Sequence, residues 1–160
     1  MRVLPVILML AGLWQGAAAP ASAQTETGAK LEGPAEVVSA STLKVEGTLL
    51  RLYGIVAPQQ GETCPLNGRR IDCGHIAATQ LMDLTAGATV TCEVQDNEAD
   101  PPTARCLAGD YDLSEGMVYT GWARPLMFAA DNLKKAQATA RERENGLWSG
   151  DFPASVKAVA

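Results

Sequence analysis

Short runs of apolar and β-branched residues, bounded by turn-forming residues, recur along the chain and are typical of β-strands. They predict five strands: Ala35–Ser39, Thr42–Glu46, Thr48–Ile55, Ala88–Val94 and Thr103–Ala108. Glu46 and Gly47 stand between the second and third runs, where a tight reversal fits. The first three strands are therefore expected to form a meander.

Three further stretches have the apolar spacing or the composition of helices. They are Gly74–Leu84, Asp112–Ala123 and Asp131–Asn145. Asp112 or Ser114 is placed to cap the second helix, and Gly146 suits the end of the third. The segments Gln60–Asp72 and Gln95–Pro102 are expected to be a loop and a solvated hairpin tip.

The first residues look like an export signal rather than part of the domain. Arg2 precedes an apolar segment over residues 3–14, and small residues ending at Ala23 form a cleavage site. An uncleaved anchor is the alternative, although a spanning helix needs about 20 apolar residues. The sequence predicts a signal peptide (1–23), a flexible leader (24–33), one folded domain (34–152) and a C-terminal tail (153–160). The mature protein is expected to be periplasmic or secreted, with no membrane insertion.

The charge balance disfavours nucleic acid as a partner. The 160 residues carry a net charge of −5, and removing residues 1–23 deletes one base (Arg2) and no acid, giving −6. Proteins that hold nucleic acid mostly neutralise its phosphates with Lys and Arg. A protein partner or a small anionic ligand fits an acidic domain better.

All four cysteines lie in the mature part, and an even number in an exported chain predicts two disulfides. Three pairings are possible. Cys64–Cys73 and Cys92–Cys106 is the favoured one, because it closes one short loop and joins two strands of one predicted hairpin. Zinc is the competing interpretation, but there is no C-x-x-C pair and the chain has one histidine, His75.

The segment Arg51–Gln59, RLYGIVAPQ, carries a single charge within an apolar strand. Arg51 on such a strand is either a solvated surface residue or a ligand for an anion. The segment resembles the Arg-Leu-x-Gly-Ile-Asp-Ala-Pro-Glu motif of the staphylococcal nuclease-like (thermonuclease) family. Residues 144–152, ENGLWSGDF, are similar to the end of that family's last helix, where the tryptophan, here Trp148, packs on the domain.

The resemblance covers roughly Pro34–Phe152 and implies a fold and a site. The implied fold is α+β and mainly β, a five-stranded OB-type Greek-key barrel with three helices. The implied site contains a phosphate-binding arginine, calcium-ligand aspartates, a catalytic glutamate and a second arginine. Secreted family members also carry cysteines in similar places, which supports the local disulfide pairing.

This chain departs from the family at four of the five places. Arg51 is retained, but Val56 stands at a calcium-ligand aspartate and Gln59 at the catalytic glutamate. Ser41 stands at the other calcium ligand. A count without gaps puts Pro101 at the second arginine, and using Arg105 instead would shift the register by four residues.

These departures remove the metal ligands and the general base together. The leading hypothesis is an exported, catalytically inactive binding or assembly module of the cell envelope, in which Arg51 and Tyr53 receive an anion or a protein carboxylate. One alternative is a metal-dependent endonuclease or phosphodiesterase that cleaves DNA or RNA with other ligands, with calcium as its cofactor. Glu62, Asp72 and the acids of residues 96–100 are the candidate ligands. The other is a structural subunit of an envelope complex. No cofactor motif is present.

Overall fold

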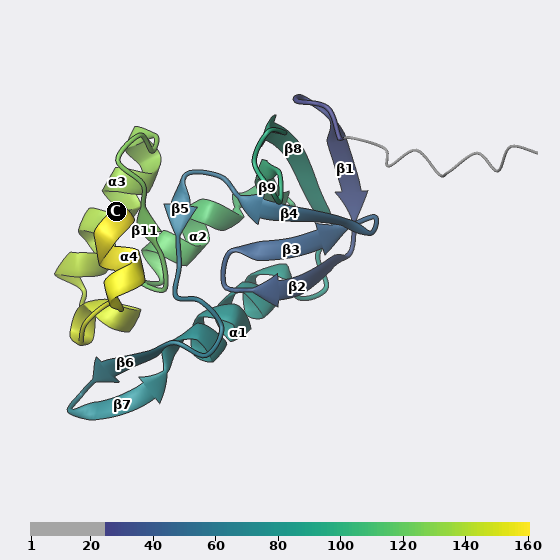
Figure 1. The fold of residues 1–160 in the computed structure, drawn as a ribbon. Helices are drawn as coiled ribbons and strands as arrows, with labels where there is room; N and C mark the ends of the chain where they lie inside the picture. The colour runs from purple at the N-terminus through teal and green to yellow at the C-terminus, as the bar shows by residue number, and fades with distance from the viewer. Residues whose placement is uncertain (1–24) are drawn as a thin grey trace, which may run out of the picture.

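The computed structural model describes residues 25–160, and the fold is α+β with a mixed sheet as its centre (Figure 1). The predicted signal peptide and Gln24 lie outside the described residues. The main sheet contains β1 (Lys30–Gly33), β2 (Ala35–Ser39), β3 (Thr42–Val45), β4 (Thr48–Leu52), β8 (Val90–Asp96), β9 (Thr103–Ala108) and β10 (Tyr111–Asp112). Its hydrogen-bonded order is β1-β8-β9-β4-β3-β2, with β10 on β9. The β4–β9 pair is parallel and the other pairs are antiparallel.

The first two strands are separated by Pro34 alone, yet they pair with opposite ends of the sheet. Lys30–Gly33 pairs with β8, whereas Ala35–Ser39 pairs with β3. Pro34 has no N–H to donate, so a bend there breaks no ladder hydrogen bond. The hydrogen-bonded strand order therefore begins with β1 and ends with β2, and the bend at Pro34 connects these two strands. The stretch expected to be a flexible leader therefore contains an ordered strand, and the main sheet has more strands than predicted.

The predicted meander is confirmed. β2, β3 and β4 pair in sequence, and the reversal between β3 and β4 lies at Glu46 and Gly47. Their φ angles are 50° and 77°, the left-handed values that a two-residue type I′ turn requires. Leu43, Val45 and Leu50 face inward along these strands and are fully buried.

The three predicted helices are present; the first is one residue longer at each end than predicted, and the other two are shorter. They are α1 (Cys73–Thr85), α2 (Leu113–Tyr119) and α3 (Asp131–Glu142). The Asp112 carboxylate caps α2 by accepting from the Glu115 N–H at 3.2 Å, as one of the two predicted caps. α2 ends before Ala123 because Gly121 has a φ of 79°. α1 packs against β2, and α2 packs against β9 and α3.

Residues 60–72 are not a simple loop, because they contain a second small sheet. β6 (Thr63–Leu66) and β7 (Arg69–Asp72) form a hairpin that projects from the body at the lower left of Figure 1. Asn67 and Gly68 have φ angles of 49° and 74°, again a type I′ turn. The Asn-Gly pair was a hairpin signal that the sequence analysis passed over. Leu66 bridges to Gly150, which ties the hairpin to the end of the chain.

The predicted C-terminal tail also has structure. A short 3₁₀ turn, η1 (Gly146–Ser149), leads to helix α4 (Ala154–Val159). Two core clusters result. The larger lies between the main sheet and α1 to α3, and the smaller, which we call the C-terminal cluster, consists of Cys64, Cys73, Leu147, Phe152 and Val156.

Both predicted disulfides are confirmed. Cys92 and Cys106 are paired residues of β8 and β9 in the larger core, and Cys64–Cys73 lies in the C-terminal cluster. All four cysteines are fully buried. Within residues 25–160, no helix has the length and hydropathy needed to cross a membrane.

Candidate functional site

A cleft of about 430 Å³ brings four of the five family positions together. Ser41, Arg51, Val56 and Gln59 all line it, although they come from a turn, two strands and a loop. Pro101 does not line the cleft, but it lies in the β8–β9 connection, which contributes Ala99 to the wall beside Asp96 at the end of β8. Its neighbour Pro102 accepts a hydrogen bond from the Arg51 N–H at 2.9 Å.

Strand β4 aims Arg51 outward. Leu50 and Leu52 on either side are buried, so the alternation of the strand places Arg51 on the other face. Its side chain is half-buried, and its guanidinium makes no hydrogen bond or ion pair with any other described residue. Thr103, opposite Arg51 on β9, also lines the cleft, and its buried Oγ1 has no partner in the described chain. The cleft therefore offers a cation that has no partner among the described residues.

Val56 belongs to a short strand, β5 (Ile55–Val56), which pairs with β11 (Arg124–Pro125). Its side chain packs against the C-terminal cluster while also lining the cleft. Val159, near the end of α4, completes the wall beyond it. This place is thus filled by apolar packing.

Gln59 lies in a turn that contacts of its own backbone N–H and carbonyl groups hold in place. Its N–H donates to the Glu62 carboxylate at 2.6 Å, and Gly74 approaches so closely that a Cβ there would lie 1.9 Å from the Gln59 carbonyl oxygen. The Glu62 carboxylate is thereby engaged by the turn. Asp72 caps α1 by accepting from the His75 N–H at 2.9 Å. Glu62 and Asp72, two of the acids considered as replacement ligands, thus have structural roles. His75 is an exposed residue at the helix start.

The cleft residues do not fit calcium. Calcium takes six to eight oxygens, several of them from carboxylates. Asp96 is the one carboxylate among the described residues that line the cleft, and its Oδ1 accepts the Glu98 N–H at 2.9 Å. Across residues 25–160, no group of three or more His, Cys, Asp and Glu residues is arranged to hold a metal ion.

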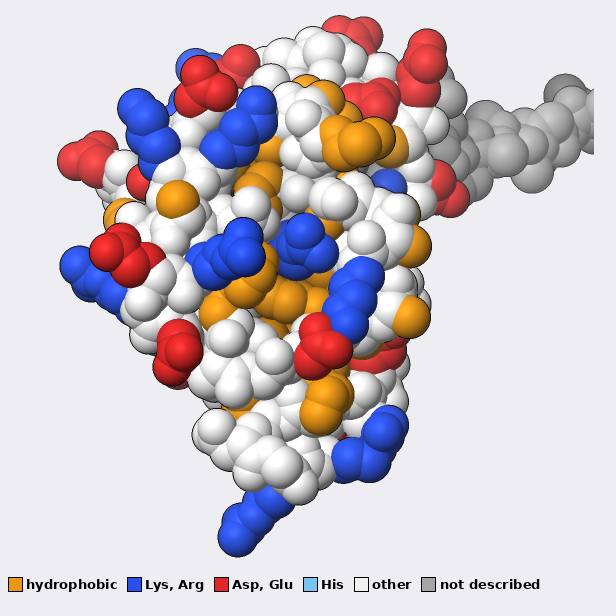
Figure 2. Space-filling view, turned by 90° about the vertical axis from the view of Figure 1, so that its left-hand side faces the viewer, with side chains coloured by type: hydrophobic (Ala, Val, Ile, Leu, Met, Phe, Trp, Pro, Cys, Tyr) orange, Lys and Arg blue, Asp and Glu red, His pale blue; other side chains and the backbone are white. Residues whose placement is uncertain are grey.

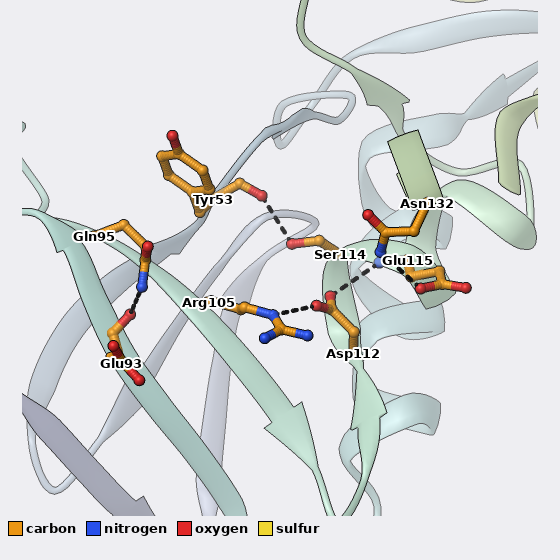
Figure 3. Close-up of polar contacts among 8 residues, drawn as sticks. All are labelled: Tyr53, Glu93, Gln95, Arg105, Asp112, Ser114, Glu115 and Asn132. Carbon is orange, nitrogen blue, oxygen red and sulfur yellow. Dashed lines mark hydrogen bonds and ion pairs between the residues drawn. The ribbon is translucent and has the colours of Figure 1, made fainter. Parts of the chain in front are cut away.

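A second pocket of about 330 Å³ shares Tyr53 and Gly54 with the cleft, and we call it the polar pocket because polar and charged residues make up most of its lining. In Figure 3, Arg105 from β9 points toward Asp112 at the start of α2, with its Nε 2.9 Å from the Asp112 carboxylate. Ser114 donates to the Tyr53 carbonyl at 3.0 Å, and Asn132 from α3 donates to Glu115 at 2.8 Å. The Ser114 bond ties the turn that carries Tyr53 to helix α2.

Phe128 and Leu126 also line the cleft, and sequence reasoning did not find them. They come from the connection between β11 and α3, which the backbone N–H of Leu126 joins to the Gly54 carbonyl at 2.9 Å. The Phe128 ring lies 5.8 Å from that of Tyr53. No motif marks these positions, because only this long-range contact brings them to the site.

Trp148 packs on the domain, as the resemblance implied. Its ring meets Phe152 edge-on at 5.0 Å, and the Arg124 guanidinium lies 5.8 Å from its centre. Figure 2 shows the face that lies at the left of Figure 1, where apolar side chains gather in the middle with Lys and Arg side chains over and around them. Arg141 also approaches the Trp148 ring, at 5.9 Å. Cation–π contacts of this kind occupy these arginines.

The sequence was compared with models of protein families and with curated proteins, and it matches none of them. The function is therefore inferred from the residues of the cleft and their surroundings.

Proposed function

We propose that this protein is an exported, catalytically inactive binding module that receives an anionic partner at Arg51. The observation that carries the proposal is the lining of the cleft: the Arg51 guanidinium has no hydrogen bond or ion pair with the described residues, and Ser41, Val56 and Gln59 are neutral, which leaves Asp96 as the one acid of the lining. A half-buried guanidinium that has no partner among the described residues favours a carboxylate or another oxyanion as its ligand.

The chemistry of the same residues argues against hydrolysis. A glutamine at position 59 cannot take a proton from water, and loss of general-base help costs about 100- to 10,000-fold in rate. The cleft offers one carboxylate, Asp96, where a divalent ion would need several oxygens. Arg51 can still bind an anion even where it has no part in catalysis.

We further propose that the domain is of the OB type, as in the staphylococcal nuclease-like family. In support, one bent chain segment supplies both β1 and β2 and so links the two ends of the strand order. The disulfides and the predicted signal peptide support a periplasmic or secreted location. The partner we expect is a protein carboxylate or a small anion, because the acidic net charge disfavours nucleic acid.

The test combines a metal titration with a cleavage assay. Calorimetry of the mature protein with Ca²⁺ should show no site tighter than millimolar, and plasmid DNA and RNA should stay intact with Ca²⁺, Mg²⁺ or Mn²⁺. Metal-dependent cleavage that disappears in Arg51→Ala would overturn the proposal in favour of a nuclease.

Partner capture from an envelope extract tests the binding role. Arg51→Ala should lose the partner, whereas Arg69→Ala should keep it, because Arg69 lies on the projecting hairpin and is exposed. Equal capture by both variants would show that Arg51 is not the binding residue.

A further inference from the structure

We propose that the cleft and the polar pocket form one groove that binds an acidic oligosaccharide. Its sugar rings would lie on Tyr53 and Phe128, and one carboxylate would pair with Arg51. This inference rests on the proposed function, because it names the class of anion that Arg51 receives.

The two pockets are neighbours. Tyr53 and Gly54 line both the cleft of about 430 Å³ and the polar pocket of about 330 Å³, so a ligand that spans both would pass over Tyr53. Together they offer room for an extended ligand rather than for a single small ion.

An exposed aromatic pair lines the cleft, and one of its members, Tyr53, also lines the polar pocket. Tyr53 is 39% exposed and Phe128 65% exposed, and their rings are 5.8 Å apart at an angle of 52°. Exposed aromatic pairs next to pockets mark binding surfaces, because their apolar faces are poorly solvated. The C–H faces of sugar rings are the apolar surfaces that stack on such rings while their hydroxyls stay outside.

The polar pocket suits hydroxyl groups, which both donate and accept. Arg105 uses Nε for Asp112, and its other guanidinium nitrogens have no partner in the described chain. Asn132 and Gln95 each use the amide nitrogen, for Glu115 and for the Glu93 carbonyl, so their amide oxygens remain available (Figure 3). These planar side chains thus present donors and acceptors side by side.

The distribution of charge selects an acidic saccharide over a polyphosphate. Arg105 and Asp112 form an ion pair at 2.9 Å, so the polar pocket has no surplus charge. Arg51 in the cleft is the cation without an ion-pair partner, although the exposed Asp96 stands on the same rim. A nucleic acid carries a charge at every residue and needs several cations along its path. A chain of neutral sugar units with occasional carboxylates matches one free arginine beside an uncharged pocket.

Calorimetry of the mature protein tests this with hexamers of hyaluronan and of unsulfated chondroitin, in which carboxylate-bearing and neutral sugars alternate, and with the neutral hexamer of β-1,4-glucose as control. We expect at least one acidic hexamer to bind, and the neutral one to bind at least about tenfold more weakly because the bond to Arg51 is missing. Tyr53→Ala and Arg51→Gln should each weaken the acidic hexamer by about tenfold or more. Tyr119→Ala removes another exposed tyrosine, outside both pockets, and should leave binding unchanged.

Three results would overturn the inference: no binding by any acidic hexamer, binding that survives Tyr53→Ala, or equal binding of the neutral hexamer. Thermal unfolding of each variant verifies that it is folded. If no saccharide binds but an Arg51-dependent partner is captured, the inference fails while the proposed function stands. Metal-dependent cleavage of nucleic acid would instead remove the proposed function.

Discussion

Val56 lies directly opposite Arg124 across the β5–β11 pair, and its side chain also packs against the C-terminal cluster. The place that a calcium-ligand aspartate holds in the nuclease-like family is thus integrated into the apolar packing of α4 and η1. A carboxylate at this position would leave water and meet an apolar cluster on one side. The apolar side chain at position 56 therefore contributes to the packing of the C-terminus.

The first prediction follows from this contact. Val56→Asp should lower the free energy of unfolding by about 1–3 kcal/mol, because a polar group replaces an apolar one against the cluster. Urea unfolding measures it. Val38→Asp is the matched control, since Val38 is 42% exposed on β2, and it should cost clearly less. Equal losses would mean that Val56 packing does not matter.

Restoring the acids should restore a metal response. In the combined variant Ser41→Asp, Val56→Asp, Gln59→Glu, three carboxylates would line the cleft beside Asp96. We expect Ca²⁺ to raise the melting temperature of this variant and to leave the natural protein unchanged, as measured by thermal unfolding. An equal calcium response in the natural protein would contradict the neutral character of its cleft.

Gly74 controls the position of Gln59. A Cβ at Gly74 would lie 1.9 Å from the Gln59 carbonyl oxygen, so Gly74→Ala must displace the loop that forms one wall of the cleft. We expect a loss of about 1–3 kcal/mol in the free energy of unfolding. Gly33→Ala is the control, because its nearest neighbour would be at 3.8 Å. Similar urea midpoints for the two variants would refute this close approach.

The two disulfides should stabilise different regions. Replacing either pair by alanine should cost about 2–4 kcal/mol in the free energy of unfolding. Cys64 and Cys73 belong to the C-terminal cluster, so their removal should also raise amide hydrogen exchange in η1 and α4. Removal of Cys92 and Cys106 should not raise amide hydrogen exchange in η1 and α4 more than in the rest of the protein. The opposite pattern of exchange would place α4 on the larger core.

An ion pair near α4 makes stability depend on acid pH. Lys157 Nζ lies 2.6 Å from Asp151 Oδ2, and its hydrogen bond lowers the pKa of the Asp151 carboxyl. A pKa that is lower in the folded state adds stability above the unfolded pKa, and this stability is lost as pH falls through the folded value. Asp151→Asn should therefore lower the urea midpoint slightly at pH 6 and have no effect well below about pH 4.

Asp110→Asn is the control for this measurement, because Asp110 is exposed and its side chain makes no ion pair or hydrogen bond with the other described residues. It should behave as the natural protein does at both pH values. A stabilising effect of Asp151→Asn near neutral pH would show that the pair does not support the fold.

Several local features could be predicted because neighbouring residues decide them. The Glu46-Gly47 reversal requires left-handed backbone at two adjacent residues, and the Asp112 cap acts three residues along the chain. Cys92 and Cys106 face each other because they lie on consecutive strands of one hairpin. The Asn67-Gly68 turn belongs to the same class, and its signal was present but not used.

Other features depend on partners far along the chain. Lys30–Gly33 has no strand signal of its own and becomes β1 by pairing with β8, and α4 is a helix of six residues that is held by the C-terminal cluster. Short elements of this kind gain stability from packing rather than from propensity.

The sequence by itself determined that Arg51 is a cation and that Ser41, Val56 and Gln59 are neutral. Only the tertiary structure decided that these residues converge on one cleft together with Asp96 and Phe128, and that Asn132 lines the pocket beside it. The physical reason is the distance along the chain over which each kind of interaction acts. Backbone turns, caps and alternation act over a few residues, whereas a binding groove forms where packed elements bring remote side chains together, and its members share no local pattern.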